Sequence, residues 1–265
     1  MAWPEKVAVL GAGVMGVQIA ALFVAAGRRV QLFDLANSSD PTARARSGVA
    51  RGLNARPPAF YTPEMADLIE LGSLDDLSAL AEADWVIEAI VEERSTKRKI
   101  LARLEAEAGG SAVISSNTSG LSIAQLIEGR KADFSRRFLG VHFFNPPRQM
   151  RLVEVIPTLT TDSAVVKQVA DFLKEVLGKE VVFARDTPNF IANRLGIFAI
   201  LSMLHIAERE GLTVPLVDAL SGPLMGRPKS ATLRLCDIIG LDTLARVSQT
   251  AYDGLFDDPW RAVFA

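Results

Sequence analysis

A glycine-rich turn near the N-terminus constrains the fold of this chain more than any other feature of its sequence. A short apolar strand pattern at residues 7–10 runs into Gly11-Ala-Gly-Val-Met-Gly16, and an apolar helix pattern follows over about residues 14–26. A second strand pattern at residues 29–34 ends in Asp34. A strand, a G-x-G-x-x-G turn, a helix and a second strand that ends in a carboxylate together form the βαβ unit that holds dinucleotides.

Each glycine of this turn has a separate physical task. Gly11 permits the tight turn, Gly13 lets backbone amides approach a pyrophosphate, and Gly16 lets the helix pack against the strand. The first residues of the helix, Val14 and Met15, expose backbone N–H groups at the positive end of the helix dipole, where phosphates bind. We therefore expect these five residues to bind a dinucleotide cofactor.

Asp34 decides which dinucleotide fits. A carboxylate at the end of the second strand accepts hydrogen bonds from the adenosine ribose hydroxyls and repels a 2′-phosphate. The sequence therefore predicts NAD(H) rather than NADP(H). The alternative is a structural glycine-rich turn followed by a chance acidic residue, and it leaves the order of strand, turn, helix and carboxylate unexplained.

Strand and helix patterns alternate up to about residue 185, which predicts an α/β fold with a mainly parallel sheet of the Rossmann type. Residues 36–66 break this rhythm with four prolines and a basic stretch at residues 44–51, and we interpret them as an insertion. Further strands are expected at residues 84–90, 112–116, 138–144, 152–156 and 180–184, with helices at about 94–108 and 163–177.

Only helical patterns appear from residue 186 onward, which predicts a smaller all-helical domain. Thr187 suits a helix N-cap and Pro188 the first helical position, so a long helix is expected to start there. We therefore predict an NAD-binding Rossmann domain at residues 1–185 and a helical C-terminal domain at residues 186–265.

Composition narrows the classes of function. The 265 residues carry a net charge of −2, which gives no general attraction to nucleic acid or to an anionic membrane surface. No apolar run is long enough to span a membrane, and the first residues lack a signal-peptide pattern. The single cysteine, Cys236, indicates a reducing cytoplasm, and with only two histidines beside it we expect no metal site.

A histidine and a glutamate stand out among the predicted strands. His142 ends a buried strand, and the carboxyl ends of strands are where open α/β sheets bind ligands. Glu154 interrupts the next apolar strand, where a carboxylate is costly unless it has a partner. A carboxylate on one imidazole nitrogen fixes the tautomer and makes the other nitrogen a better base for an alcohol proton. The two residues equally fit a structural pair that ties two strands together.

Other polar residues carry weaker signals. The segment Ser115-Ser-Asn-Thr-Ser-Gly120 follows a buried strand, and it can serve a nicotinamide ribose, a substrate oxygen or simply a turn. Asn193 falls in the first turns of the long helix, where a surface residue is also expected. His205 lies further along the same pattern and is predicted to be packed or at the solvent edge. The residues alone thus point to an NAD-dependent oxidoreductase with a His–Glu pair.

Several motifs, taken together and in order, resemble the L-3-hydroxyacyl-CoA dehydrogenase family. The resemblance is strongest to longer β-oxidation enzymes, and within them to the dehydrogenase part, which precedes an enoyl-CoA hydratase part. It implies NAD-dependent oxidation of an (S)-3-hydroxyacyl-CoA to a 3-ketoacyl-CoA in fatty-acid β-oxidation. The motifs are Gly11-Ala-Gly-Val-Met-Gly16, Val86-Ile-Glu-Ala-Ile-Val-Glu92, Ser116-Asn-Thr-Ser119, His142-Phe-Phe-Asn-Pro146, Leu152-Val-Glu-Val-Ile156, Asp186-Thr-Pro-Asn-Phe-Ile-Ala-Asn-Arg194 and Ile239-Gly-Leu-Asp-Thr243.

The resemblance also implies roles for single residues. His142 corresponds to the catalytic base of the family and Glu154 to the carboxylate that orients it. Ser119 corresponds to a serine that contacts the substrate oxygen and the nicotinamide region, and Asn193 to an asparagine that helps polarise the carbonyl of the thioester-linked substrate. The positions near the cofactor correspond to Glu92, Lys97 and Asn117.

The chain departs from the family in three places. The insertion offers no lysine that matches the CoA-binding lysine, so Arg44 and Arg51, with Arg46, either contact CoA phosphates or form a solvated basic face. Asn189 stands where many members have glycine. The chain ends soon after residues 239–243, where the family's helical domain continues, which indicates a truncated helical domain. That domain usually mediates dimerisation, so the resemblance implies a homodimer.

Three hypotheses follow. The first is an enzyme of fatty-acid β-oxidation that acts on an acyl-CoA, and turnover of acetoacetyl-CoA with NADH tests it. The second is an NAD-binding module that is catalytically idle outside a larger polypeptide and binds NADH without turnover. The third is a dehydrogenase of a small hydroxy acid without CoA, which a comparison of free 3-hydroxybutyrate with its CoA thioester separates from the first.

Overall fold

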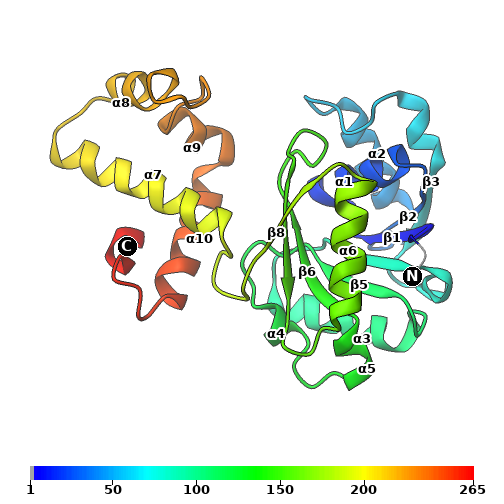
Figure 1. Ribbon diagram of the computed structural model, residues 1–265. Coiled ribbons are helices and arrows are strands. Elements are labelled where there is room, and N and C mark those ends of the chain that lie inside the picture. The colour runs from blue at the N-terminus through cyan, green and yellow to red at the C-terminus, as the bar shows by residue number, and fades with distance from the viewer. Residues whose placement is uncertain (1–2) are drawn as a thin grey trace. The chain divides into compact units, whose positions relative to one another are not determined.

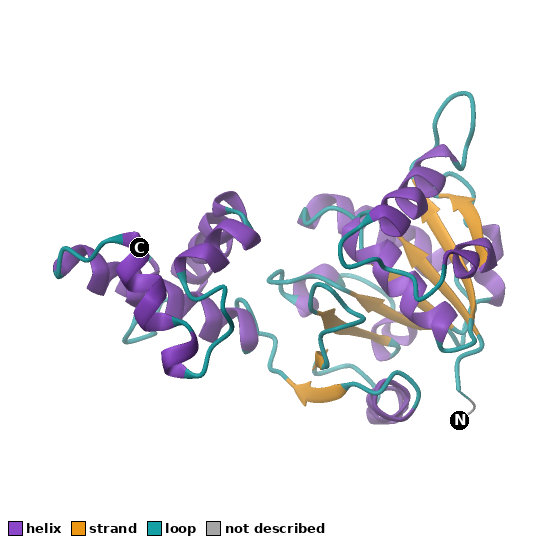
Figure 2. Cartoon of the chain, turned by 90° about the horizontal axis from the view of Figure 1, so that it is seen from above, coloured by secondary structure: helices purple, strands orange, loops and turns teal. Residues whose placement is uncertain are grey.

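The computed structural model describes residues 3–265 and divides the chain into two compact units, Met1–Asp186 and Thr187–Ala265 (Figure 1). All strands of the described chain belong to the first unit, and the second contains only helices and loops (Figure 2). The division lies one residue after the predicted boundary at residue 185.

The first unit is built on one sheet of eight strands in the order β3-β2-β1-β4-β5-β6-β7-β8. Strands β1 to β6 run parallel to their neighbours, β7 is antiparallel to β6, and β8 is parallel to β7. The predicted α/β fold with a mainly parallel sheet is therefore confirmed. The strands are β1 Lys6–Leu10, β2 Arg29–Asp34, β3 Ile69–Ser73, β4 Trp85–Glu88, β5 Val113–Ser116, β6 Phe138–Phe143, β7 Leu152–Pro157 and β8 Glu180–Phe183.

The strand order creates the place for a ligand. The chain moves outward from β1 through β2 to β3, and it then returns to the other side of β1 with β4. The two connections leave the sheet in opposite directions, so a crevice forms outside the carboxyl ends of β1 and β4. The predicted cofactor and acid–base residues follow the ends of β1, β2, β4, β5 and β6, which are neighbours at this edge.

Helices cover the sheet and bury its apolar side chains. The helices of the first unit are α1 Val14–Ala25, α2 Ala43–Asn54, α3 Arg94–Glu107, α4 Ile123–Leu126, α5 Ala132–Arg136 and α6 Ser163–Glu175. Phe23 of α1 stacks on Phe172 of α6 with ring centroids 5.6 Å apart, and both rings contact Trp85 of β4. This aromatic cluster packs α1, α6 and β4 together, and aromatic pairs of this kind add about 0.5–1.5 kcal/mol beyond their buried area.

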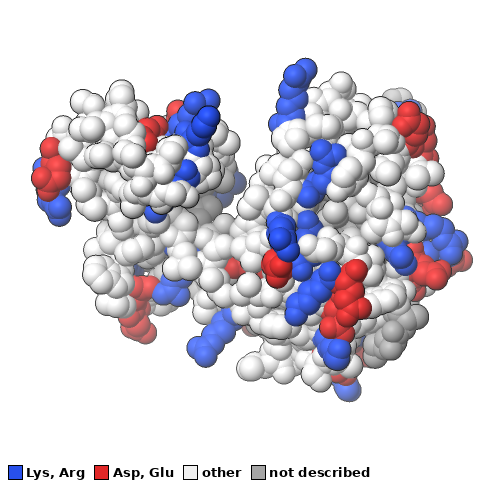
Figure 3. Space-filling view, turned by 45° about the horizontal axis from the view of Figure 1, so that its top comes forward, with Lys and Arg blue, Asp and Glu red and all other residues white. Residues whose placement is uncertain are grey.

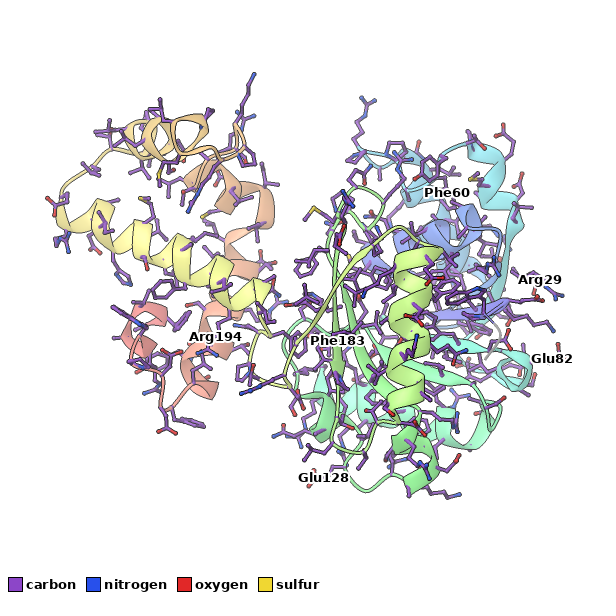
Figure 4. All side chains as sticks on the ribbon, viewed as in Figure 1. Arg29, Phe60, Glu82, Glu128, Phe183 and Arg194 are labelled. Carbon is purple, nitrogen blue, oxygen red and sulfur yellow. The ribbon has the colours of Figure 1, made fainter. Side chains whose placement is uncertain are left out.

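The prediction of an irregular insertion at residues 36–66 is wrong in part, because residues 43–54 form the helix α2. Gly48 and Gly52 lower the helix propensity of this segment, but they let the helix pack closely on the first βαβ unit. A Cβ at Gly48 would lie 2.5 Å from the Ala12 carbonyl oxygen, and one at Gly52 would lie 2.5 Å from a Val17 methyl group. Pro41 precedes the helix and the other three prolines follow it, and Phe60 is buried against Gly52 (Figure 4). Tertiary packing thus makes a helix where the local pattern argues for a loop.

The second unit consists of α7 Ala192–Arg209, α8 Val214–Ser221, α9 Leu233–Ile239 and α10 Leu241–Gly254, with two short 3₁₀ turns. Its own small core includes Ile197 of α7, Cys236 of α9 and Ala251 of α10. Arg194, in the first turn of α7, forms an ion pair with Asp258 (Figure 4). His205 is exposed on α7, in agreement with the predicted solvent-edge position.

The predicted start of the long helix at Thr187 is wrong, because α7 begins at Ala192. Residues 188–191 form a turn in which Asn189 and Phe190 have φ angles of 60° and 49°. This left-handed region favours glycine, and asparagine is the side chain that tolerates it best. The Asn189 amide also donates to the Val247 carbonyl at 2.8 Å. The backbone geometry therefore explains why asparagine can replace the glycine common in the resembling family.

Candidate active site

The glycine turn has the shape that a bound diphosphate requires. Gly11 has a φ of 101°, and a Cβ there would lie 2.6 Å from the Ala89 carbonyl oxygen. A Cβ at Gly16 would lie 1.7 Å from the Gly11 carbonyl oxygen, so α1 can pack this close only with glycine. Gly13 is different, because it is exposed and open space surrounds its Cβ position. The turn is closed toward the protein and open toward solvent at the N-terminus of α1.

Asp34 lies beside this turn. Its Oδ2 accepts a hydrogen bond from the Ala12 N–H at 2.6 Å, and its Oδ1 accepts one from the Leu35 N–H at 2.7 Å. The residue is only partly buried, and a carboxylate has about four lone-pair positions, so sites remain for ribose hydroxyls. The backbone of the turn and of the next residue therefore orients both oxygens of this carboxylate.

His142 and Glu154 face each other across the antiparallel pair β6–β7. They are direct register partners, and the His142 Nδ1 lies 2.8 Å from the Glu154 Oε2. The relative exposures are 4% for His142 and 1% for Glu154. A carboxylate can only accept, so the Nδ1–H of His142 is the donor in this contact. The predicted contact between the two residues is confirmed, and its chemical role stays a prediction.

A buried ion network lies behind the ends of β4 and β5, and sequence reasoning missed its central residue, Glu88. The Lys97 Nζ lies 2.6 Å from the Glu88 Oε1 and 3.3 Å from the Glu92 Oε2. Glu88 is fully buried, Lys97 is 1% exposed, and the Ser116 hydroxyl donates to the second oxygen of Glu88. A glutamate at the end of an apolar strand is a signal for a buried partner, as it was for Glu154.

The loop after β5 joins this network to the end of β6. The Asn117 N–H donates to the Glu88 carbonyl at 2.8 Å, and the Asn117 Oδ1 accepts from the Phe143 N–H at 2.9 Å. Glu92 accepts from the Thr118 hydroxyl and, at 2.8 Å, from the Ser119 N–H. The structure thus brings Glu92, Lys97, Asn117 and Ser119 together, and it ties them to the strand that carries His142.

The remaining predicted residues lie on helices, Arg51 and Arg44 on α2 and Asn193 on α7. Arg51 is on α2, and its guanidinium donates to the Ala12 carbonyl at 3.1 Å, which places it against the glycine turn. Arg44 is exposed in the first turn of α2. Asn193 is the second residue of α7 in the helical unit. Arg51 therefore contacts the glycine turn, whereas the structure gives no such contact for Arg44.

A second buried lysine fixes the loop between β6 and β7. The Lys179 ammonium donates to the carbonyl oxygens of Pro147 and, at 2.8 Å, of Met150. Burial lowers the pKa of Lys179, because no carboxylate offsets the loss of water around its charge. This loop also reaches α1 through the Asn145 Oδ1, which accepts from the Gln18 Nε2 at 3.0 Å.

Among residues 3–265, no cluster of three or more His, Cys, Asp or Glu side chains is arranged to hold a metal ion. Within that same range, no helix has both the length and the apolar character needed to cross a membrane. Acidic and basic side chains lie intermingled on the face shown in Figure 3.

The glycine turn, the acid that ends β2 and the buried His–Glu pair define the class of protein, an NAD-dependent oxidoreductase on a Rossmann sheet. Sequence comparison agrees, because residues 6–187 match the family described as "3-hydroxyacyl-CoA dehydrogenase, NAD binding domain". The chain belongs to the 3-hydroxyacyl-CoA dehydrogenase family, and these residues form its NAD-binding domain.

Relatives and solved structures give the same result. A "Probable 3-hydroxyacyl-CoA dehydrogenase" of Deinococcus radiodurans is 48% identical over 247 residues, covering 92% of this chain and 71% of that protein. A protein of the same description from Bacillus subtilis is 42% identical, but the chain spans only 34% of its length. The crystal structure of FadB2 from M. tuberculosis superposes with a TM-score of 0.84 at 33% identity, covering 98% of this chain and 90% of that one.

Proposed function

We propose that this chain catalyses the NAD-dependent oxidation of an (S)-3-hydroxyacyl-CoA to a 3-ketoacyl-CoA, as a step of fatty-acid β-oxidation. The observation that carries the proposal is the buried His142–Glu154 pair, held at 2.8 Å beside the crevice that the strand order creates. Relatives described as 3-hydroxyacyl-CoA and 3-hydroxybutyryl-CoA dehydrogenases support the substrate class.

His142 is the general base in this proposal. Its Nε2 takes the proton of the 3-hydroxyl group as the C3–H bond breaks and the C3=O bond forms. Bound NAD supplies the chemistry of hydride acceptance from C3. The imidazole becomes a cation in this step, and Glu154 stabilises that cation from 2.8 Å in a buried setting. In the reverse direction, His142 returns the proton to the carbonyl oxygen.

Two further residues contact the substrate in our proposal. The Ser119 hydroxyl binds the reacting oxygen, and Glu92 fixes the Ser119 backbone through its N–H at 2.8 Å. Asn193, at the start of α7, helps polarise the carbonyl of the thioester-linked substrate. Both roles rest on the match of their motifs to the family.

The residues present fit NAD. A Cβ at Gly11 or Gly16 would collide with the backbone that shapes the turn, and the open side at Gly13 would leave room for a diphosphate at the N-terminus of α1. We propose that Val14 and Met15 offer backbone N–H groups to the phosphates. Asp34 binds the adenosine ribose hydroxyls through oxygens that the turn has already oriented.

Glu92 and Asn117, which follow the ends of β4 and β5, would hold the nicotinamide half of the cofactor in this proposal. Lys97 is 1% exposed, so its part is to hold Glu92 in place rather than to reach the cofactor. Arg51 adds a positive charge at the phosphate turn, which suits the cofactor pyrophosphate. Arg44, exposed on the same helix, remains a candidate for CoA phosphates.

We further propose a cytoplasmic homodimer that uses the helical unit. That unit leaves large apolar side chains exposed, among them Leu224 at 79% and Phe256 at 75%, and a second copy would cover such surface. The single thiol, Cys236, is buried and free, which fits a reducing compartment.

Mixing the chain with acetoacetyl-CoA and NADH, and following the loss of the reduced nicotinamide absorbance, tests the proposal. We expect turnover, and we expect His142→Gln to reduce kcat by about 10²–10⁴-fold while NADH affinity stays within twofold. Turnover of free acetoacetate at the same rate would favour a small hydroxy acid as substrate. NADH binding without turnover in folded protein would favour the idle module, and normal turnover of the His142 variant would exclude this base.

A further inference from the structure

Two carboxylates hold the loop of residues 118–124, one from each end. Glu92 accepts from the Thr118 hydroxyl and the Ser119 N–H at its start. Asp186 accepts from three donors at its end, where the short helix α4 begins. The proposed substrate-contacting residue, Ser119, lies between these two anchors. The first anchor belongs to the proposed cofactor site, and the second has no part in the mechanism described above.

The Asp186 carboxylate accepts three hydrogen bonds from this segment. Its Oδ1 accepts from the Ile123 N–H at 2.8 Å, and its Oδ2 accepts from the Ala124 N–H at 2.8 Å and the Ser122 hydroxyl at 2.9 Å. Hydrogen bonds to a charged acceptor are shorter and stronger than those between neutral groups. The three bonds therefore hold the segment three to five residues beyond Ser119.

Asp186 is also separated from this loop by more than 60 residues of sequence. It is the last residue of the first unit, and the chain passes directly from it to Thr187 in the helical unit. A helix of four residues such as α4 gains little by itself from a distant cap, because most helical stability comes from packing. The contact instead defines where the loop ends relative to the sheet.

We propose that Asp186 is a positioning residue for the reaction, and that it acts by holding the 118–124 loop so that the Ser119 hydroxyl meets the substrate oxygen. This inference rests on the proposed function, because it assigns Asp186 a part in the same hydride-transfer step. Glu92 fixes the start of the loop and Asp186 fixes its end, so the loop has one conformation before substrate arrives. Pre-orientation of this kind lowers the barrier without any contact to the reacting atoms.

The first test compares Asp186→Asn with a matched control, Asp162→Asn. Asp162 is the N-cap of α6 and accepts from the Ala164 N–H at 2.8 Å, and it lies 38 residues after the end of the 118–124 loop. We expect the Asp186 variant to lower kcat for acetoacetyl-CoA about ten- to a hundredfold, with NADH affinity within twofold. We expect the control variant to lose a comparable amount of Tm and to keep its kcat. Equal kcat in the two variants would overturn the proposal.

The second test asks whether Asp186 acts through Ser119. If it does, Asp186→Asn lowers kcat in the wild-type background and has no further effect in a Ser119→Ala background, because coupled residues are not additive. Independent, multiplicative effects would overturn the proposal. If the Asp186 variants do not fold, Ser122→Ala provides the same test, because it removes only one of the three hydrogen bonds to Asp186. We expect this variant to lower kcat a few fold.

Different results would contradict the proposed function and the role of Asp186. A wild-type chain that binds NADH but turns over no acyl-CoA contradicts the proposed function, and the inference falls with it. A wild-type chain with full turnover whose Asp186 and Asp162 variants behave alike contradicts only the inference. Measurement of NADH binding by fluorescence for every variant separates a loss of positioning from a loss of the cofactor site.

Discussion

The two halves of the sheet edge are held together by different forces. Around β1, α1 and β2, the site is made of backbone and small residues, with Gly11, Gly16 and the N–H groups that orient Asp34. Around β4 to β7, it is made of buried charged side chains, with Glu88 against Lys97 and His142 against Glu154. The first half depends on close steric fit and the second on electrostatic pairing, so equivalent substitutions should have unequal effects.

The largest expected effect is the loss of the buried cation at Lys97. Lys97→Met would leave Glu88, which is fully buried, without its charged partner, and removing one member of a buried pair lowers stability by about 3–5 kcal/mol. Urea unfolding measures this change. The double variant Lys97→Met, Glu88→Gln should recover part of the loss. A Lys97 variant within 1 kcal/mol of wild type would contradict the electrostatic account.

A smaller effect is expected for the cation of the first half, Arg51. Its guanidinium is exposed and donates to a carbonyl oxygen, so Arg51→Ala should change the unfolding free energy by less than about 0.5 kcal/mol. Loss of a charge beside the phosphate turn should instead weaken NADH binding about tenfold, with a weaker dependence on salt. Fluorescence titration at two salt concentrations measures both. Arg44→Ala is the matched control on the same helix. An equal loss of NADH affinity in that variant would show that only the overall charge matters, and not the position of Arg51 beside the turn.

The smallest effect concerns Lys179, a buried cation that is held by carbonyl oxygens. Burial lowers its folded pKa below the ordinary 10.5, so between that pKa and 10.5 the unfolded chain binds more protons than the folded chain. Stability must then rise with pH in this window. We expect the unfolding free energy of wild type to rise relative to that of Lys179→Met as the pH rises toward 10.5. Chemical unfolding at pH 8 and pH 10 measures it; a constant or shrinking difference would contradict the assignment.

Sequence reasoning succeeds where a function depends on local order. The glycine turn and Asp34 are readable because spacing along one βαβ unit fixes their geometry. The His142–Glu154 contact is readable because a carboxylate in an apolar strand requires a partner, and two histidines offer few choices. The same rule applied to Glu88 would have predicted its pairing with Lys97.

Sequence reasoning fails where distant contacts override the local pattern. Helix α2 contains Gly48 and Gly52, which weaken a helix pattern, and both are needed for packing on the turn at Ala12 and Val17. The delayed start of α7 depends on Asn189, whose φ of 60° and bond to Val247 involve a helix about sixty residues further on. The anchor at Asp186 is invisible for the same reason, because its donors lie in another segment.

The antiparallel pairing of β6 and β7 makes the His142–Glu154 contact a property of strand register. His142 and Glu154 are opposite each other across the hairpin, and a shift of one residue in either strand would turn one side chain to the other face of the sheet. The connecting loop, residues 144–151, does not enter that register. The loop instead bears on the pair through packing, because the ring of Phe144 lies with its centroid 4.5 Å from that of His142. Strand register thus sets which two side chains meet, and the first residue of the loop helps to set how the imidazole ring is oriented.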